Sequence, residues 1–152
     1  MGATPITQPA FDFTGKGLFP TFAFLPSQYP MFTMLAQAFE DVGVRGYKGQ
    51  VPALISDKKA LTYVLTIHSV EARHACEVRR LRTKKGWITF NLRDDLPAYF
   101  QPVYDGEQST TQGTVNVAAL AEGFGGDAGA TQAFDEPLTM AQVLAIINPF
   151  IV

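Results

Sequence analysis

The clearest hydrophobic repeat lies on a long segment in the middle of the chain. Side chains recur there at intervals of three and four, the spacing that places them on one face of an α-helix. The stripe is Val64, Ile67, Glu71, His74, Val78 and Leu81. We predict a helix over residues 57–85, with Ser56 as its N-cap and Gly86 just past its end. The basic residues 79–85 fall near the C-terminus, where they suit the helix dipole.

A second helix is predicted over residues 30–48. Pro30 suits a first turn, because its missing N–H is not needed there, and Gly49 suits the left-handed residue after the end. Its buried face is expected to be Phe32, Leu35, Ala36, Phe39 and Gly43. The two helices are separated by about seven residues, a length that normally makes antiparallel neighbours.

The rest of the chain is less regular. Prolines and glycines forbid a continuous helix over residues 1–27, yet the segment carries five phenylalanines, so we expect an irregular arm lying on apolar surface. Six glycines punctuate residues 87–135, where we expect loops with one short strand near 114–117. Thr139 and Gln142 form a capping box for a last helix.

These elements predict a single all-α domain over residues 1–152. Its parts are an irregular arm (1–27), an antiparallel helix hairpin (28–86) and a loop-rich tail (87–152) that ends in a short helix (139–148). With 47% hydrophobic and 17% charged residues among 152, the chain can build a core and is not disordered throughout.

Charge and leader signals narrow the partners. A formal net charge of −2 gives no overall attraction to nucleic acid or to an anionic membrane. No apolar stretch approaches the ~20 residues that a membrane span needs. The N-terminus lacks a basic region followed by an apolar run, so we predict no signal peptide in this chain and leave the compartment open.

Candidate chemistry lies where ionisable residues interrupt the buried stripe. Glu71 and His74, three apart on a helix, project to the same side, so one metal ion can contact both. A buried carboxylate is costly unless it is paired or holds a metal. On the other helix, Glu40 lies on the edge of the buried face beside the small Gly43. In an antiparallel pair Glu40 and Glu71 come level within roughly 8 Å. The predicted metal ligands are therefore Glu40, Glu71 and His74.

Simpler interpretations stay open for the same residues. Glu71 and His74 can form a buried pair that only orients the helices, and Glu40 can form a salt bridge to Arg73 or Arg45. His68 fits a helix-face histidine with a local hydrogen bond. We interpret the basic residues 79–85 as a helix C-terminal cation run rather than a nucleic-acid surface.

At these residues the sequence resembles a known family. The segments that carry the likeness are 39–49, 67–75, 110–113 and 134–139. They resemble the bacterial ferritin-like, desiccation-related proteins, and the likeness covers about residues 10–150. Ferritin-like di-iron proteins use one Glu from each of two helices and Glu-x-x-His from each of the other two. The resemblance implies an iron or manganese centre in which Glu71 bridges two ions, His74 binds one and Glu40 caps the same one.

The chain supplies half of that ligand set, because the family's domain begins with another helix pair. We expect either that this chain is a truncated product or that two copies associate as a homodimer to rebuild four helices. Exposed inner faces should then promote self-association. The residues expected on those faces are Phe32, Leu35, Phe39, Ile67 and Val78.

The resemblance implies metal oxidation or storage, or protection in oxidative or desiccation stress. The alternative is a non-catalytic structural or stress-related helical bundle without a working metal site. The sequence does not decide whether the protein is an enzyme, and export of longer relatives stays open.

Overall fold

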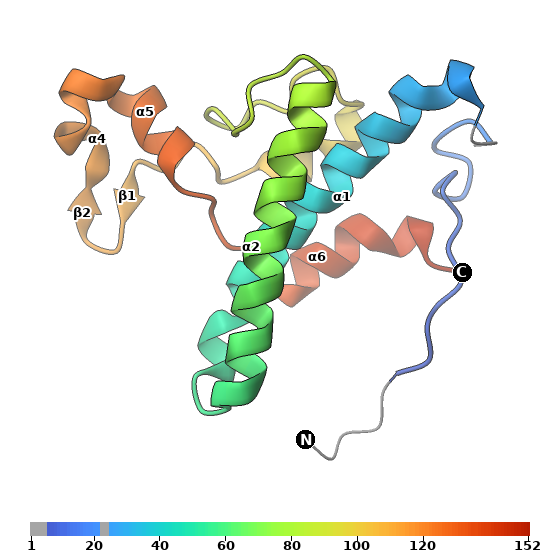
Figure 1. Cartoon of the computed structure of the whole chain (residues 1–152), viewed down its shortest axis with the longest axis horizontal. Helices are drawn as coiled ribbons and strands as arrows, with labels where there is room; N and C mark the ends of the chain where they lie inside the picture. Colours follow the sequence, from blue (N-terminus) through green and yellow to red (C-terminus); the bar gives the residue numbers. More distant parts are fainter. Residues whose placement is uncertain (1–5, 22–24) are drawn as a thin grey trace.

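Two long helices dominate the structure, a computed structural model that describes residues 6–21 and 25–152. Helices α1 (Tyr29–Gln50) and α2 (Lys58–Leu81) run antiparallel, side by side, joined through a 3₁₀ turn at Val51–Leu54 (Figure 1). The predicted helix hairpin is confirmed.

The tail adds shorter elements around this pair. They are α3 (Gln101–Tyr104), β1 (Thr111–Gln112), β2 (Val115–Asn116), α4 (Val117–Leu120), α5 (Gly126–Ala133) and α6 (Met140–Ile147). The strands form a small antiparallel hairpin with Thr111 opposite Asn116, and the regular structure in residues 6–21 and 25–152 is otherwise helical apart from an isolated bridge between Phe11 and Ile151. In Figure 1 this hairpin, α4 and α5 form a lobe beside α2, whereas α6 lies next to α1, with which it packs.

The start of α2 differs from the prediction by one residue. Asp57, not Ser56, is the N-cap, and its carboxylate accepts from the backbone N–H groups of Lys59 and Ala60 at 3.1 and 3.0 Å. A carboxylate also suits the positive end of the helix dipole, so Asp57 fulfils both roles.

The end of α2 lies four residues before the predicted Lys85. Thr83 adopts a left-handed backbone with φ of 59°, and the N–H of Lys84 donates to the carbonyl of Arg79 at 2.9 Å. This is a Schellman cap with threonine in the position that glycine usually takes. Gly86 has a different role, because a Cβ there would lie 2.5 Å from Cys76 Sγ.

Gly49 was wrongly predicted to follow α1, since it lies inside that helix. The tail explains why it is glycine: a Cβ at this position would clash with the carbonyl oxygen of Leu138. Glycine is used here for close backbone approach rather than for a left-handed turn.

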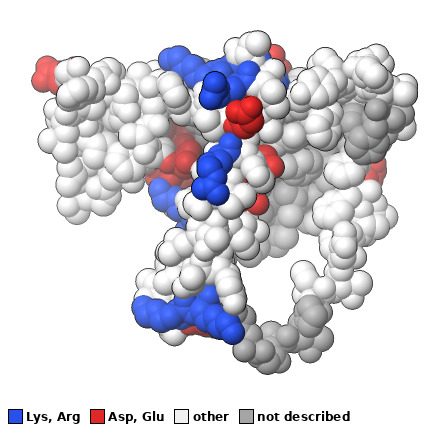
Figure 2. Space-filling view, viewed as in Figure 1, with Lys and Arg blue, Asp and Glu red and all other residues white. Residues whose placement is uncertain are grey.

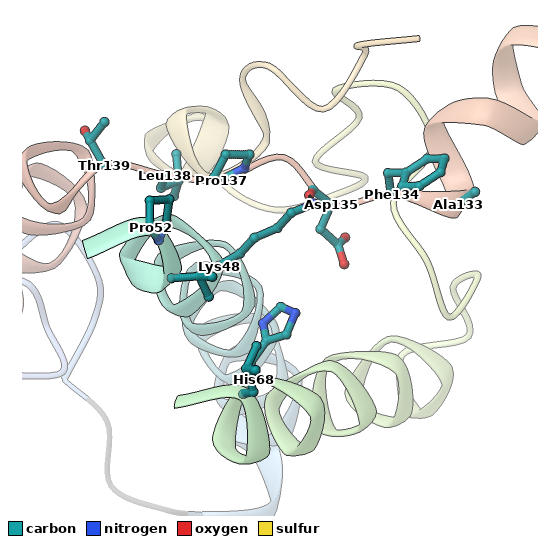
Figure 3. A pocket seen from close by; sticks show the side chains of 12 residues that line it. Lys48, Pro52, His68, Ala133, Phe134, Asp135, Pro137, Leu138 and Thr139 are labelled. Atoms are coloured by element: carbon teal, nitrogen blue, oxygen red, sulfur yellow. Dashed lines mark hydrogen bonds between the residues drawn. The ribbon is translucent and has the colours of Figure 1, made fainter. Parts of the chain in front are cut away.

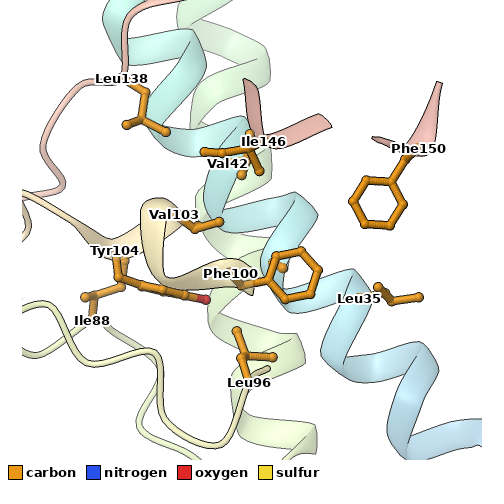
Figure 4. Close-up of a cluster of buried hydrophobic side chains, with 11 residues drawn as sticks. Leu35, Val42, Ile88, Leu96, Phe100, Val103, Tyr104, Leu138, Ile146 and Phe150 are labelled. Carbon is orange, nitrogen blue, oxygen red and sulfur yellow. The ribbon is translucent and has the colours of Figure 1, made fainter. Parts of the chain in front are cut away.

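The hydrophobic core lies between α1 and the tail rather than between α1 and α2 alone. Figure 4 shows side chains of α1, α3 and α6 meeting there with those of the loops around them. The fully buried members include Leu96, Phe100, Val103, Tyr104, Leu138 and Phe150. The tail therefore covers a face of α1 that the sequence left open. The expected exposure of Leu35 and Phe39 was wrong, because Leu35 is buried and Phe39 packs edge-on against Phe150.

The irregular arm contributes to this core as predicted. Phe19 stacks on Phe100 and Phe150 with ring centroids 5.4 and 5.9 Å apart. Phe11 is half exposed and bridges to Ile151 at the other end of the chain. Two more phenylalanines of the predicted arm, Phe22 and Phe24, lie outside the described residues.

The tail is more helical than predicted. The expected strand near 114–117 is present as β2, but α3, α4 and α5 were missed. Gly126 and Gly129 lie within α5 and hide it from a propensity-based prediction. The last helix is confirmed together with its complete capping box between Thr139 and Gln142.

Candidate metal site

The structure brings the three predicted ligands to one side of the helix pair. Nδ1 of His74 lies 3.5 Å from Oε2 of Glu40, across the interface between α2 and α1. Glu71 lies against Gly43, where a Cβ would come within 2.9 Å of Glu71 Oε2. The small residue one turn from Glu40 therefore leaves room for the second carboxylate, as the sequence indicated.

The two carboxylates influence each other. Burial raises the pKa of Glu40 to about 8, and the hydrogen bond and negative charge of Glu71 act in the same direction. Oε2 of Glu40 is buried and has no hydrogen-bond partner among the described residues. Since like charges at close range cannot both ionise at low cost, the pair favours holding a proton or a cation.

These donors fit a divalent ion as part of a ligand set. Carboxylate oxygen and imidazole nitrogen suit iron and manganese, and Glu40 Oε2 is a buried acceptor that a cation would satisfy. However, within residues 6–21 and 25–152 no group of three His, Cys, Asp or Glu side chains converges as a metal-binding cluster. His74, whose side chain is 57% exposed, stands at the open edge of the site.

Two neighbouring side chains, Tyr47 and His68, differ in whether they lie close to the candidate ligands. Burial and the charge of Glu71 raise the pKa of Tyr47, so this phenol lies within the electrostatic influence of Glu71. His68 lies one turn before Glu71 but faces α1, where its Nδ1 is 3.0 Å from the carbonyl oxygen of Val44. The predicted hydrogen bond of His68 thus reaches across to the neighbouring helix.

Arg45 does not pair with Glu40, contrary to one of the simpler interpretations. It is fully buried and its Nε lies 2.7 Å from Oε1 of Glu107 and from the carbonyl oxygen of Glu136. Arg45 therefore binds the tail, because the carboxylate of Glu107 and the segment of residues 133–139 after α5 (the strap) both contact it.

A buried ion-pair network beside the site was missed by sequence reasoning. Arg79 Nη2 donates to Asp41 Oδ2 at 2.7 Å, and the hydroxyl of Tyr104 donates to the same oxygen at 2.6 Å. Arg79 Nη1 also donates to Asp94 at 3.2 Å. Arg79 lies in the last turn of α2, as the predicted cation run requires, but the run did not indicate that its partners come from α1 and the tail. Arg79 follows Ala75 by four residues and both are buried in the structure, although neither belongs to the stripe that the sequence predicted to be buried.

A pH series tests the Glu40 assignment. A carboxyl whose pKa is raised in the folded state contributes stability that is fully present below its unfolded value of about 4.5 and lost as pH rises through about 8. Glu40→Gln cannot titrate, so its free energy of unfolding should not show this loss. We expect the difference in unfolding free energy between Glu40→Gln and wild type to shift by about 1–2 kcal/mol in favour of the variant from pH 5 to pH 9, allowing for solvent screening.

Urea unfolding at pH 5, 7 and 9 measures this difference. Glu77→Gln, at an exposed position of α2, is the matched control and should follow wild type. Parallel pH profiles for Glu40→Gln and wild type would show that Glu40 is not the titrating group.

Comparison with known proteins identifies a family that includes this part of the chain. The model of a family described as "Ferritin-like domain" matches residues 1–84. The match includes α1 and α2, and so all three candidate ligands. No curated protein and no solved structure matches the chain. Among the described residues, no helix combines the length and the hydropathy needed to cross a membrane.

Proposed function

Since the chain belongs to the ferritin-like domain family, we propose that Glu40, Glu71 and His74 form half of a two-metal carboxylate site. The observation that carries this proposal is the pair of adjacent carboxylates with a histidine 3.5 Å from one of them. Such an arrangement raises the cost of the empty site and lowers the cost of holding a divalent cation.

In this proposal the chain's own residues hold and protect the ion. Glu40 and Glu71 supply carboxylate oxygens, and His74 supplies an imidazole nitrogen. Gly43 keeps the space between the helices open for Glu71. A bound iron or manganese pair would supply the capacity to oxidise Fe(II) with oxygen or peroxide.

The other half of the site requires a second helix pair. A two-metal site of this kind uses about six side-chain ligands, and this face presents three. The stripe of α2 around them is still partly open: Ile67 is 39% and Leu81 55% exposed. A second helix pair, from a second copy or from a separate segment, would cover this apolar surface and bring the remaining ligands.

The alternative function is a structural or stress-related bundle protein without a working metal site. It is favoured by the lack of a converged three-residue cluster in the described part of the chain. In that case the Glu40–Glu71 pair would keep its proton and only orient the two helices.

Titration with Mn(II) distinguishes these functions. If the ion replaces the proton of Glu40, binding at pH 7 releases protons and tightens as pH rises toward 8. We expect Glu71→Ala to bind at least about tenfold more weakly than wild type, whereas Glu77→Ala on the exposed side of α2 should bind like wild type. Calorimetry in two buffers of different ionisation enthalpy measures both quantities. Equal affinities for Glu71→Ala and wild type, without proton release, would favour the structural function.

A further inference from the structure

A cavity of about 710 Å³ lies on another side of the helix pair, where the end of α1, the middle of α2 and the strap of residues 133–139 meet (Figure 3). Its volume falls within the range of small-molecule sites. None of Glu40, Glu71 and His74 lines it. The cavity is therefore separate from the candidate metal site.

The strap is fixed to α1 at several points, which holds the cavity open. The N–H of Leu138 donates to the carbonyl of Arg45 at 3.0 Å, and the Lys48 ammonium donates to the carbonyl of Asp135. Gly49 allows the Leu138 carbonyl to touch α1. The lining is mostly apolar, with Val51, Pro52, Leu65, Phe134 and Pro137 among its residues.

Two hydrogen-bond acceptors lie at the polar side of this cavity. Nδ1 of His68 must carry a proton, because its partner, the carbonyl oxygen of Val44, can only accept. In the neutral ring Nε2 is then an acceptor. Figure 3 shows the His68 ring and the Asp135 carboxylate directed toward each other from α2 and from the strap.

Lys48 adds hydrogen-bond donors to the two acceptors, His68 and Asp135. An ammonium has three N–H groups, and counting the described residues Lys48 gives one of them to Asp135, so two remain for another acceptor. A primary amide presents two N–H donors and one carbonyl acceptor on a neutral group. It can match His68, Asp135 and Lys48 together without adding charge to a half-buried pocket.

We propose that this cavity binds a small molecule that has a primary amide head group and an apolar body. The amide faces His68, Asp135 and Lys48, and the apolar body lies against Leu65, Pro52 and Phe134. An ammonium in the same place would meet Lys48, and a carboxylate would meet Asp135, so each charged analogue carries a repulsive contact.

Three matched probes test the head group. They are 4-tert-butylbenzamide, its N,N-dimethyl derivative without N–H donors, and 4-tert-butylbenzoate. Saturation-transfer NMR and calorimetry on the whole chain should show binding of the benzamide at least about tenfold tighter than binding of either analogue, since unpaired buried acceptors are costly.

Variants test the location. His68→Phe keeps a ring but removes the acceptor, and should weaken the benzamide about tenfold. Leu65→Trp places a larger side chain in the cavity from an exposed helix position, and should abolish binding. His74→Ala, on the other side of the pair, should bind the benzamide like wild type.

The proposal is overturned by equal affinities for the benzamide and its dimethyl derivative, or by normal binding in Leu65→Trp. It is equally overturned if the benzamide shows no saturable binding up to about 5 mM, because a ligand of this size in a matching site should bind more tightly than that.

Discussion

Arg79→Ala is expected to lower the free energy of unfolding by about 3–5 kcal/mol. The arginine side chain is 2% exposed and bonded to Asp41, and its guanidinium carbon lies 5.5 Å from the ring centroid of Tyr104. Removing it leaves the carboxylate of Asp41 buried without a cationic partner. An uncompensated buried charge costs far more than the net contribution of the pair itself.

The neighbouring Arg80 provides the control. It follows Arg79 directly on α2 but is exposed, so Arg80→Ala should change stability by no more than about 0.5 kcal/mol. Urea unfolding followed by far-ultraviolet circular dichroism measures both variants. Stabilities within about 1 kcal/mol of each other would show that the Asp41–Arg79 pair does not organise the core.

The second large effect expected is metal-dependent association. Two copies that pair through their open faces bring together two sets of Glu40, Glu71 and His74, which matches the ligand number of a two-metal site. Metal that binds only the assembled state stabilises it by mass action, about 2.7 kcal/mol at a hundredfold excess over the dissociation constant. The single chain, with three ligands, should bind iron weakly and show no oxidation of Fe(II).

Variants distinguish metal-dependent association from non-specific association. Glu71→Ala and His74→Ala should each remove the effect of metal on association, because each removes a ligand. His68→Ala should keep it, since His68 bonds to the carbonyl of Val44 and faces the cavity instead. Figure 2 shows basic side chains near both ends of α2 and also along the middle of its visible face.

The helix hairpin and the candidate ligands could be predicted because local signals specify them. The three-and-four spacing around Glu71 and His74 indicated one helix face, and the short connection indicated antiparallel packing. The structure places Glu40 beside both residues, although their role toward metal stays a prediction.

The packing of the tail on the helix pair could not be predicted, because it depends on long-range contacts. Arg45 and Arg79 look like surface cations until Glu107, Asp41 and Asp94 come together around them. Gly49 looks like a helix terminator until the backbone of Leu138 is seen against it. In each case a partner distant in sequence decides the role of a residue whose local signal is ordinary.

We propose that Glu40, Glu71 and His74 are half of a metal site that assembly completes. Sedimentation velocity of wild type and Glu71→Ala, each with and without Mn(II), tests it most directly. We expect Mn(II) to shift wild type from monomer toward dimer and to leave Glu71→Ala unchanged. A metal-dependent shift of the same size in Glu71→Ala, or no shift in wild type at millimolar Mn(II), would contradict it.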